Sequence, residues 1–312
     1  MRAFGGPEVL RLEDVELPPL APGDIRIRTI AAAINHSDLE IRAGAWTIRR
    51  RDPFPYVPGL EVVGEVSEVG SAVTSVRPGE LAITMMQGLG GVRSQRPGGY
   101  QEVVTVAADA VATLPADLDP LVAAAFGLAA VTAHQGLAQL QGSRIAVTGA
   151  AGGVGSLATA IAAARGATVT AIARPGSEDY LRSLGATQVV TDPATLAPGS
   201  FDGILDCVAG PLFEGLCRSL ADRGRLSVVG AMAGDRADFS VWELLRGIAL
   251  TGYSSESLDG PSLRAAMADI VALQRTGKLA APAHRTFPLA SAAEAHALIE
   301  ARGVKGRVLL IP

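Results

Sequence analysis

The sequence predicts an α/β fold made of a β-rich domain and an inserted domain built on a doubly wound parallel sheet. Up to about residue 115, short segments of alternating apolar residues are broken by Gly and Pro, which is typical of antiparallel strands. From residue 118 onward, short β-rich runs alternate with helix-length segments, which implies a parallel sheet covered on both faces. A chain of 312 residues also exceeds what one hydrophobic core usually organises, so we expect two domains.

The first part of the chain contains four predicted strands. Each is a short run in which apolar and polar residues alternate, so that one face can be buried and the other can meet solvent. We expect a compact twisted barrel or sandwich from the segments 24–34, 61–70, 80–86 and 100–107.

The second part begins with two Ala-rich helical stretches within residues 118–138. The β-rich runs that follow are 144–149, 167–173, 187–191, 201–208, 225–230 and 248–253. The tail adds two amphipathic helices and a closing apolar strand, which we expect to return to the first domain. The predicted domains are therefore residues 1–117 with 258–312, and the inserted residues 118–257.

Composition and charge favour a small-molecule partner. The formal net charge is -4 and the basic residues are spread along the chain, which argues against a nucleic-acid or anionic membrane surface. The start lacks the apolar core of a signal peptide, and we find no run of the roughly 18 uncharged apolar residues that a spanning helix needs. We expect a soluble, cytoplasmic protein whose two cysteines, Cys207 and Cys217, are reduced and packed in the core.

The segment 144–166, "RIAVTGAAGGVGSLATAIAAARG", runs from a predicted strand through a glycine-rich turn into a helix. This context favours a dinucleotide site over an ordinary tight turn, because the helix N-terminus offers unpaired N–H groups to a pyrophosphate. Gly152 permits close approach of the backbone, Gly155 permits packing of helix on strand, and Ala150 stands where the first glycine of the pattern is usual. The residues predicted to hold the cofactor are Ala150, Ala151, Gly152, Gly153, Val154 and Gly155.

The residues after the next predicted strand favour NADPH over NADH. An Asp or Glu usually stands there to bind the ribose 2′-hydroxyl, but this chain has Ala173 followed by Arg174. A guanidinium can bind a 2′-phosphate through charge-assisted hydrogen bonds, whereas a carboxylate would repel it. Ser177 is a second, weaker candidate for that phosphate. The alternative is that Arg174 is an ordinary solvated loop residue.

The stretch 32–44, "AAINHSDLEIRAG", places a polar Asn-His-Ser-Asp cluster behind an apolar approach. Residue types alone leave three interpretations open: a metal site, a proton relay, or an ordinary turn or helix cap in which the side chains bond to nearby backbone.

Motifs in order along nearly the full length resemble the medium-chain dehydrogenase/reductase superfamily, and within it the zinc-independent quinone oxidoreductase, or zeta-crystallin-like, branch. They are "PGLEVVGEVSEVG", "AAGGVG", "GILDCVAG" and the closing "GRVLLIP". The resemblance implies a GroES-like catalytic domain and an inserted Rossmann domain.

The resemblance also implies that no zinc is bound. Zinc-containing relatives have a cysteine at the position of Asn35 and a histidine at the position of Leu60, and the segment 86–99, where their four-cysteine lobe should fall, contains no cysteine. An Asn and a Leu cannot replace these ligands. We therefore expect the polar cluster to form the floor of a metal-free active cleft.

By the same resemblance, Asn35 matches an active-cleft asparagine that could donate to a developing oxyanion, and Ser37 matches a proton-relay hydroxyl. His36 is expected to contact the cofactor or to be structural. Trp46 stands where zeta-crystallin and enoyl-thioester reductase relatives usually have a tyrosine. An indole N–H is no acid, so an aromatic wall over a flat substrate is the expected role of Trp46.

The predicted activity is transfer of hydride from NADPH to a quinone or a conjugated enone. Two alternatives stay open: an ene-reductase dedicated to one biosynthetic intermediate, and a non-catalytic NADPH-binding protein that acts as a sensor or crystallin. The resemblance further implies a homodimer joined at a sheet edge, for which residues 248–254 are the candidate strand.

Overall fold

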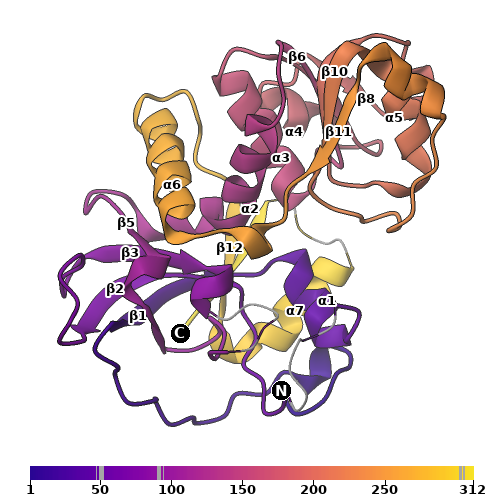
Figure 1. Cartoon of the computed structure of the whole chain (residues 1–312). Helices are drawn as coiled ribbons and strands as arrows, with labels where there is room; N and C mark the ends of the chain where they lie inside the picture. Colours follow the sequence, from indigo (N-terminus) through magenta and orange to yellow (C-terminus); the bar gives the residue numbers. More distant parts are fainter. Residues whose placement is uncertain (47, 49–52, 90–92, 94, 302–303, 305) are drawn as a thin grey trace. The chain divides into compact units, whose positions relative to one another are not determined.

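Two hydrogen-bonded sheets organise the chain in the computed structural model, one in each of two units (Figure 1). The structure describes residues 1–312 except 47, 49–52, 90–92, 94, 302–303 and 305. The first unit comprises Met1–Leu128, Ser255–Met267 and Ala281–Pro312, and the second comprises Ala129–Ser254 and Ala268–Ala280. The chain therefore builds most of the first unit and then most of the second, contributes one more segment to each, and ends in the first.

The described residues of the first unit form a mostly antiparallel seven-stranded sheet in the order β12-β13-β1-β2-β3-β5, with β4 also paired to β1. The closing strand returns as the sequence predicts, because β13 pairs antiparallel with β1 and sets Leu310 opposite Ala32. The strands are β1 Asp24–Ala33, β2 Glu61–Val69, β3 Leu81–Met85, β4 Val103–Ala107, β5 Val111–Thr113, β12 His284–Pro288 and β13 Arg307–Ile311.

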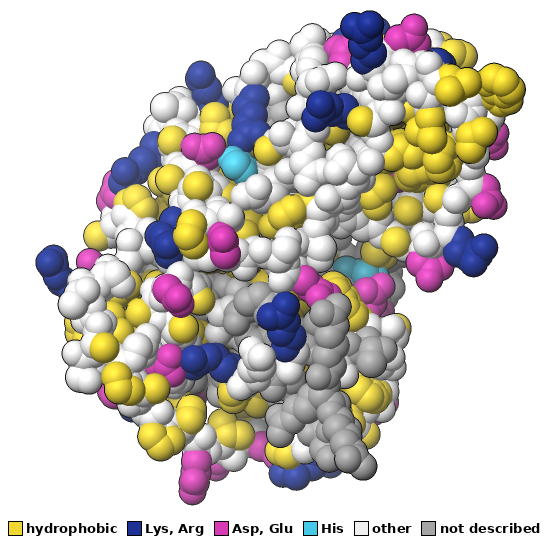
Figure 2. Space-filling view, in the orientation of Figure 1, with side chains coloured by type: hydrophobic (Ala, Val, Ile, Leu, Met, Phe, Trp, Pro, Cys, Tyr) yellow, Lys and Arg dark blue, Asp and Glu magenta, His cyan; other side chains and the backbone are white. Residues whose placement is uncertain are grey.

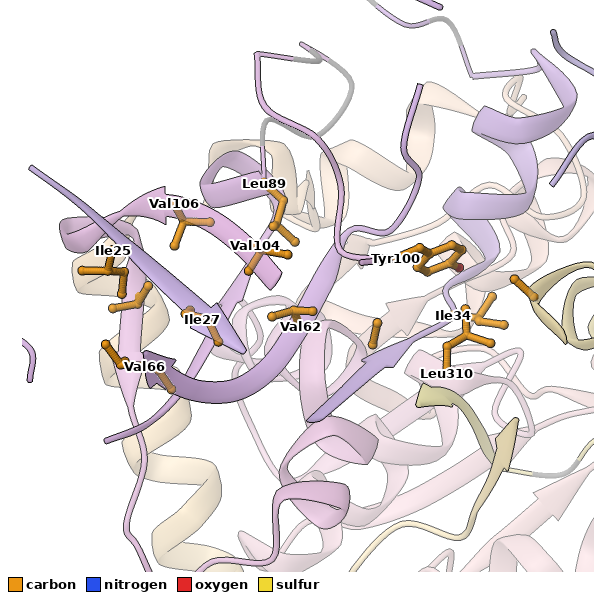
Figure 3. Close-up of a cluster of buried hydrophobic side chains, with 14 of the residues drawn as sticks. Ile25, Ile27, Ile34, Val62, Val66, Leu89, Tyr100, Val104, Val106 and Leu310 are labelled. Atoms are coloured by element: carbon orange, nitrogen blue, oxygen red, sulfur yellow. The ribbon is translucent and has the colours of Figure 1, made fainter. Parts of the chain in front are cut away.

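Alternation along these strands builds the core of the first unit. Ile25 and Ile27 of β1 are fully buried, whereas Arg28 of the same strand is exposed, because successive side chains of a strand point to opposite faces. Figure 3 shows the two isoleucines near apolar side chains of β2 and β4, and Leu310 of β13 beside Ile34 in the same cluster. Helix α7 (Ala292–Glu300) adds Ala292 and Ala295 to the same cluster.

The described residues of the second unit form a six-stranded sheet in the order β11-β10-β9-β6-β7-β8, and every ladder in it is parallel. Its strands are β6 Arg144–Thr148, β7 Thr168–Ile172, β8 Gln188–Val190, β9 Phe201–Asp206, β10 Leu220–Val228 and β11 Ala249–Gly252. Helices α3 (Gly153–Ala164), α4 (Glu178–Ser183) and α5 (Phe213–Ser219) alternate with the strands. The order is that of a doubly wound Rossmann sheet, and it reverses between β6 and β9.

Helix α2 (Pro120–Ala138) corresponds to the two Ala-rich helical stretches predicted from the sequence. Gly127, with φ 41° and ψ −147°, interrupts the helix between them. Among the helices of the described residues, α2 is long and apolar enough to cross a membrane, which differs from the expectation that no segment qualifies. However, 72% of its apolar window is buried inside the protein, as in the core helix of a globular fold.

The division into units differs from the predicted boundary at 117/118, because it falls within α2, after Leu128. The next division, after Ser254, lies three residues before the predicted boundary at 257/258, and a further one falls within α6 (Gly260–Arg275) because Ala268–Ala280 belongs to the second unit. A helix is one continuous element whose two ends can belong to different cores, so a division inside it leaves no change of composition in the sequence. Helix α1 (His36–Ala43) begins inside the polar cluster, which agrees with the helix cap among the interpretations left open.

Candidate active site

The glycine-rich turn lies between β6 and α3, as the sequence predicts. After β6 ends at Thr148, the N–H of Ala150 donates to the carbonyl of Ile172 at 3.1 Å and ties the turn to the end of β7. Gly152 is the residue before α3, and the N–H of Ser156 donates to its carbonyl at 2.9 Å. Because helical N–H groups bond four residues back, those of Gly153, Val154 and Gly155 have no acceptor inside α3.

The turn leaves room only for glycine at two points. A Cβ on Gly155 would lie 2.3 Å from the carbonyl oxygen of Gly149, so the helix can pack this closely only without a side chain. Gly149 itself has φ 56°, in the left-handed region that favours glycine. The turn thus uses Gly149 as a conformational glycine directly before Ala150, the residue at the first position of the predicted pattern.

The turn fits a dinucleotide pyrophosphate. Ala150 and Gly155 are buried and hold the backbone, while Ala151, Gly152, Gly153 and Val154 are exposed or half-buried. A loop whose free N–H groups face outward beside a helix N-terminus is a site for phosphate oxygens.

The predicted 2′-phosphate residues lie past the end of β7, the neighbour of β6. Arg174 is exposed, and Ser177 is half-buried directly before α4. Glu178, the first residue of α4, was not among the predicted residues; its Oε2 accepts the N–H of Gly176 at 2.8 Å. This contact shows that the Glu178 carboxylate stabilises the turn at Gly176. The roles of Arg174 and Ser177 in binding the 2′-phosphate stay predictions.

Asp206, at the end of β9 beside the end of β6, is another polar residue that was not among the predicted ones. Asp206, the last residue of β9, is fully buried, and its Oδ1 accepts the Thr148 hydroxyl at 2.5 Å. The same oxygen accepts the N–H of Val208 at 2.9 Å and that of Ala209 at 3.1 Å. A polar residue at the end of the apolar run "GILD" was the available signal.

In the first unit, Asn35 is the N-cap of α1, and its side chain is buried. Its amide nitrogen donates to Glu61 Oε1 at 2.8 Å and makes a longer contact of 3.4 Å to the carbonyl of Ala33. Its amide oxygen accepts from Arg307 at 3.1 Å. The side chain predicted to face the substrate is thus largely engaged inside the protein.

Glu61 is the centre of this network. Its Oε1 accepts from Arg307 at 2.7 Å, and its Oε2 accepts the N–H of Leu128 at 2.6 Å, next to the interruption of α2. A Cβ on Gly127 would lie 1.8 Å from Oε2, so only glycine admits this carboxylate. Burial raises the pKa of Glu61, and the Arg307 guanidinium opposes that rise. The Nε of Arg307 finds no partner among the described residues.

Asp38 closes the first turn of α1. Its Oδ2 accepts the N–H of Asn35 at 2.8 Å, which makes a capping box across the helix start. The side chain is buried, and burial raises its pKa to about 7.

The remaining predicted residues lie on or after α1. His36 is exposed, with Nε2 3.5 Å from Oε1 of Glu40, and Ser37 is half-buried. Trp46 is half-buried and its backbone N–H donates to the carbonyl of Glu40 at 3.2 Å; Thr47, next to it, lies outside the described residues. The structure brings Asn35, His36 and Ser37 to one helix start and leaves Trp46 beyond the other end.

Arg42 anchors the second half of α1. It donates to Nδ1 of His296 at 3.3 Å and also pairs with Glu300. Because a guanidinium only donates, Nδ1 of His296 is the acceptor and its Nε2–H donates to the Tyr100 hydroxyl at 3.0 Å. Burial, and then the Arg42 charge, lower the pKa of His296 to about 3, so this histidine is a neutral structural link.

Asn35 and Leu60 stand at the two positions where the zinc-containing relatives have ligands. Leu60 is buried, and Arg307 contacts both Asn35 and Glu61. Across the described residues, no group of three His, Cys, Asp or Glu side chains is placed to hold a metal ion.

The chain is similar to known oxidoreductases over nearly its full length. The alcohol dehydrogenase GroES-like domain family matches residues 21–116, and the zinc-binding dehydrogenase family matches residues 184–310. A quinone oxidoreductase of Sus scrofa is 31% identical, covering 99% of this chain and 95% of the relative. The mitochondrial enoyl-[acyl-carrier-protein] reductase of Bos taurus is 30% identical, covering 90% and 79%. The structure of Escherichia coli quinone oxidoreductase complexed with NADPH has a TM-score of 0.85 at 26% identity, covering 100% and 98%.

Proposed function

Because the chain belongs to the medium-chain dehydrogenase/reductase superfamily, in its quinone oxidoreductase branch, we propose that it reduces a quinone or a conjugated enone. The chain is an oxidoreductase and NADPH is its cofactor. The observation that supports this acceptor class is that the Arg307 guanidinium binds Asn35, which stands at a zinc-ligand position of the zinc-containing relatives, and Glu61.

The residues that would hold NADPH are those of the turn between β6 and α3. The space that a Cβ on Gly155 would fill, and the free N–H groups at the start of α3, suit the pyrophosphate. Arg174 would pair with the 2′-phosphate, with Ser177 beside it. When bound, the cofactor supplies the hydride, and the chain supplies position and electrostatics.

The Arg307 guanidinium pairs with Glu61 and, unlike a metal ion, does not coordinate a substrate oxygen. Reduction of a simple ketone depends on a metal ion or a proton donor that polarises the carbonyl, whereas reduction of a quinone or enone gives a resonance-stabilised anion. The chemistry of the site therefore favours acceptors that conjugation already activates.

The two amide hydrogens of Asn35 are held unequally. The hydrogen toward Glu61 makes a short contact of 2.8 Å, but the other makes only the 3.4 Å contact to Ala33. Redirected to a developing oxyanion, one placed donor contributes roughly 3 kcal/mol. We propose this role for the weaker hydrogen, with Ser37 or solvent completing protonation.

The test is a panel of quinones, enones, simple ketones and alcohols assayed with NADPH, with and without chelator, together with metal analysis of the purified protein. We expect turnover of quinones or enones that chelator leaves intact, and poor turnover of unconjugated substrates. One zinc per chain, with activity lost to chelator and restored by zinc, would overturn the proposal.

A dedicated ene-reductase is the second candidate, and the likeness to enoyl-[acyl-carrier-protein] reductase favours it. Trp46 argues against a direct copy of that enzyme's chemistry, because an indole cannot supply the proton that a tyrosine can. A kcat/KM for enoyl thioesters far above that for quinones would select this candidate.

We also propose a homodimer joined at β11. This strand is at the end of the second sheet and its residues are mostly exposed, so its outer edge can pair with a second copy. Figure 2 shows hydrophobic side chains gathered over this part of the second unit. The preceding turn, Val241–Arg246, exposes 73% of Trp242 and 74% of Leu245. Light scattering should give twice the chain mass, and Trp242→Glu with Leu245→Glu should give monomers.

A further inference from the structure

The carboxylate of Asp206 is an unusual buried group. Its Oδ1 accepts three hydrogen bonds, whereas its Oδ2 is buried and has no partner among the described residues. A buried carboxylate oxygen without a donor is costly, and such groups in native structures call for an explanation. A strained backbone conformation follows three residues further along the chain, at Ala209.

Ala209 has φ 53° and ψ −147°, a conformation that residues with a side chain rarely adopt. Its N–H and that of Val208 both donate to Asp206, so the carboxylate holds the turn after β9 in this conformation. The next loop adds a further tie, because the N–H of Ala233 donates to the carbonyl of Val208 at 2.8 Å.

The same carboxylate joins this turn to the glycine-rich turn. Thr148, the last residue of β6, donates its hydroxyl to Asp206 and accepts the N–H of Cys207 at 2.9 Å. The two strands are neighbours, with Val147 opposite Leu205. A Cβ on Gly149 would lie 3.0 Å from Cγ2 of Val208, so the two turns touch.

These turns meet where the strand order reverses, and doubly wound sheets bind nucleotides outside the strand ends at that point. We propose that Asp206 is a positioning residue for NADPH: through Thr148 and the backbone of residues 207–209, it holds the turn after β9 against the cofactor turn. The hydrogen bonds of Asp206 keep this turn in its strained conformation, so that the cofactor meets a surface already formed. This inference rests on the proposed use of NADPH.

The test measures two quantities on the full chain: the Kd of NADPH by fluorescence titration, and the melting temperature of the ligand-free protein. Thr148→Val removes the hydroxyl that joins the turns, and should weaken NADPH about tenfold, as expected for a hydrogen bond to a charged group. Thr148→Ser is the matched control, because it keeps the hydroxyl, and its Kd should stay within about twofold of wild type.

Ala209→Gly separates positioning from simple stability. Glycine adopts the positive φ without strain, so the melting temperature should rise, yet the freer turn should bind NADPH about threefold more weakly. Asp206→Ala should weaken NADPH binding further. If this variant fails to fold, the test is carried by Thr148→Val and Ala209→Gly.

Opposite movement of stability and affinity in Ala209→Gly, with loss in Thr148→Val but not in Thr148→Ser, supports the proposal. Unchanged NADPH affinity in both Ala209→Gly and Thr148→Val, in a wild-type protein that binds NADPH, overturns it and leaves the proposed function standing. A wild-type chain that binds no NADPH overturns both.

Discussion

Glu61 in the first unit and Asp206 in the second are both buried carboxylates at the ends or starts of strands, but their partners differ. Glu61 is paired with the Arg307 guanidinium and uses both of its oxygens. Within the described residues, Asp206 has only neutral donors, all on one oxygen. The carboxylate of Glu61 is compensated by a positive charge, whereas one buried oxygen of Asp206 has no hydrogen-bond donor among the described residues.

This difference separates two uses of buried charge. A compensated pair fixes how distant segments assemble, and removing one partner leaves the other as an uncompensated charge. An uncompensated oxygen beside a strained turn is typical of a surface prepared for a ligand. Changes in the Glu61 network should therefore appear mainly in stability, and changes at the cofactor turns mainly in NADPH affinity.

The largest expected effect is that of Arg307→Met. Without the guanidinium, Glu61 is a buried carboxylate facing an apolar side chain, which should lower the free energy of unfolding by about 3–5 kcal/mol. Urea denaturation of the full chain measures it. The double variant Glu61→Gln, Arg307→Met removes both charges and should regain a large part of the loss. Equal losses in the single and double variants would show that the charge pair is not the reason.

The next effect concerns the pH dependence of stability and Asp38. Burial raises its pKa to about 7, whereas an exposed Asp of the unfolded chain has a pKa of about 3.9. The folded state holds the extra proton between these values, so stability falls as pH rises from about 4 to about 7, by up to about 4 kcal/mol.

Asp38→Asn keeps an acceptor for the N–H of Asn35 and does not titrate. Relative to wild type, it should therefore lose less stability between pH 4 and pH 8, as measured by denaturation at each pH. Parallel stability curves for the two proteins would mean that Asp38 does not carry this titration.

A smaller effect is expected at Arg174, in the second unit. Arg174→Ala should weaken NADPH by about 2 kcal/mol through loss of a charge-assisted contact, and should leave NADH binding almost unchanged. Because Arg174 is exposed, the melting temperature should not move. Titration with the two cofactors measures the difference, and an equal loss for both would show that Arg174 does not read the 2′-phosphate.

The smallest expected change is in turnover. Asn35→Ala should lower kcat about tenfold with little change in the Kd of NADPH, because the interaction lost is one made in the transition state. The effect is smaller than the roughly 3 kcal/mol of an ideally placed donor, because the hydrogen must leave its contact to Ala33. The variant also removes a partner of Glu61 and Arg307, so it should lower stability as well. Ser37→Ala is the neighbouring control and should lower kcat less, since solvent can replace its proton. A change of NADPH affinity as large as that of kcat would assign Asn35 to cofactor binding instead.

Much of the fold was predictable because its causes are local. Alternation of Ile25 and Ile27 with arginines marks a strand, and the run from β6 through glycines into α3 marks a nucleotide turn. The start of α1 was left open between several interpretations, because Asn, Ser and Asp bond equally well to backbone in turns and in helix caps.

By itself, the sequence determined the two kinds of sheet, the glycine-rich turn and the residue types at the positions of Asn35 and Leu60, since periodicity, glycine sterics and ligand chemistry act within a few residues. Only the tertiary structure decided which polar groups meet. Arg307 reaches Asn35 across 272 positions of the chain, and Thr148 reaches Asp206 across 58. Such pairs depend on strand order and register, which bring distant residues together and cannot be predicted from any short segment of the sequence.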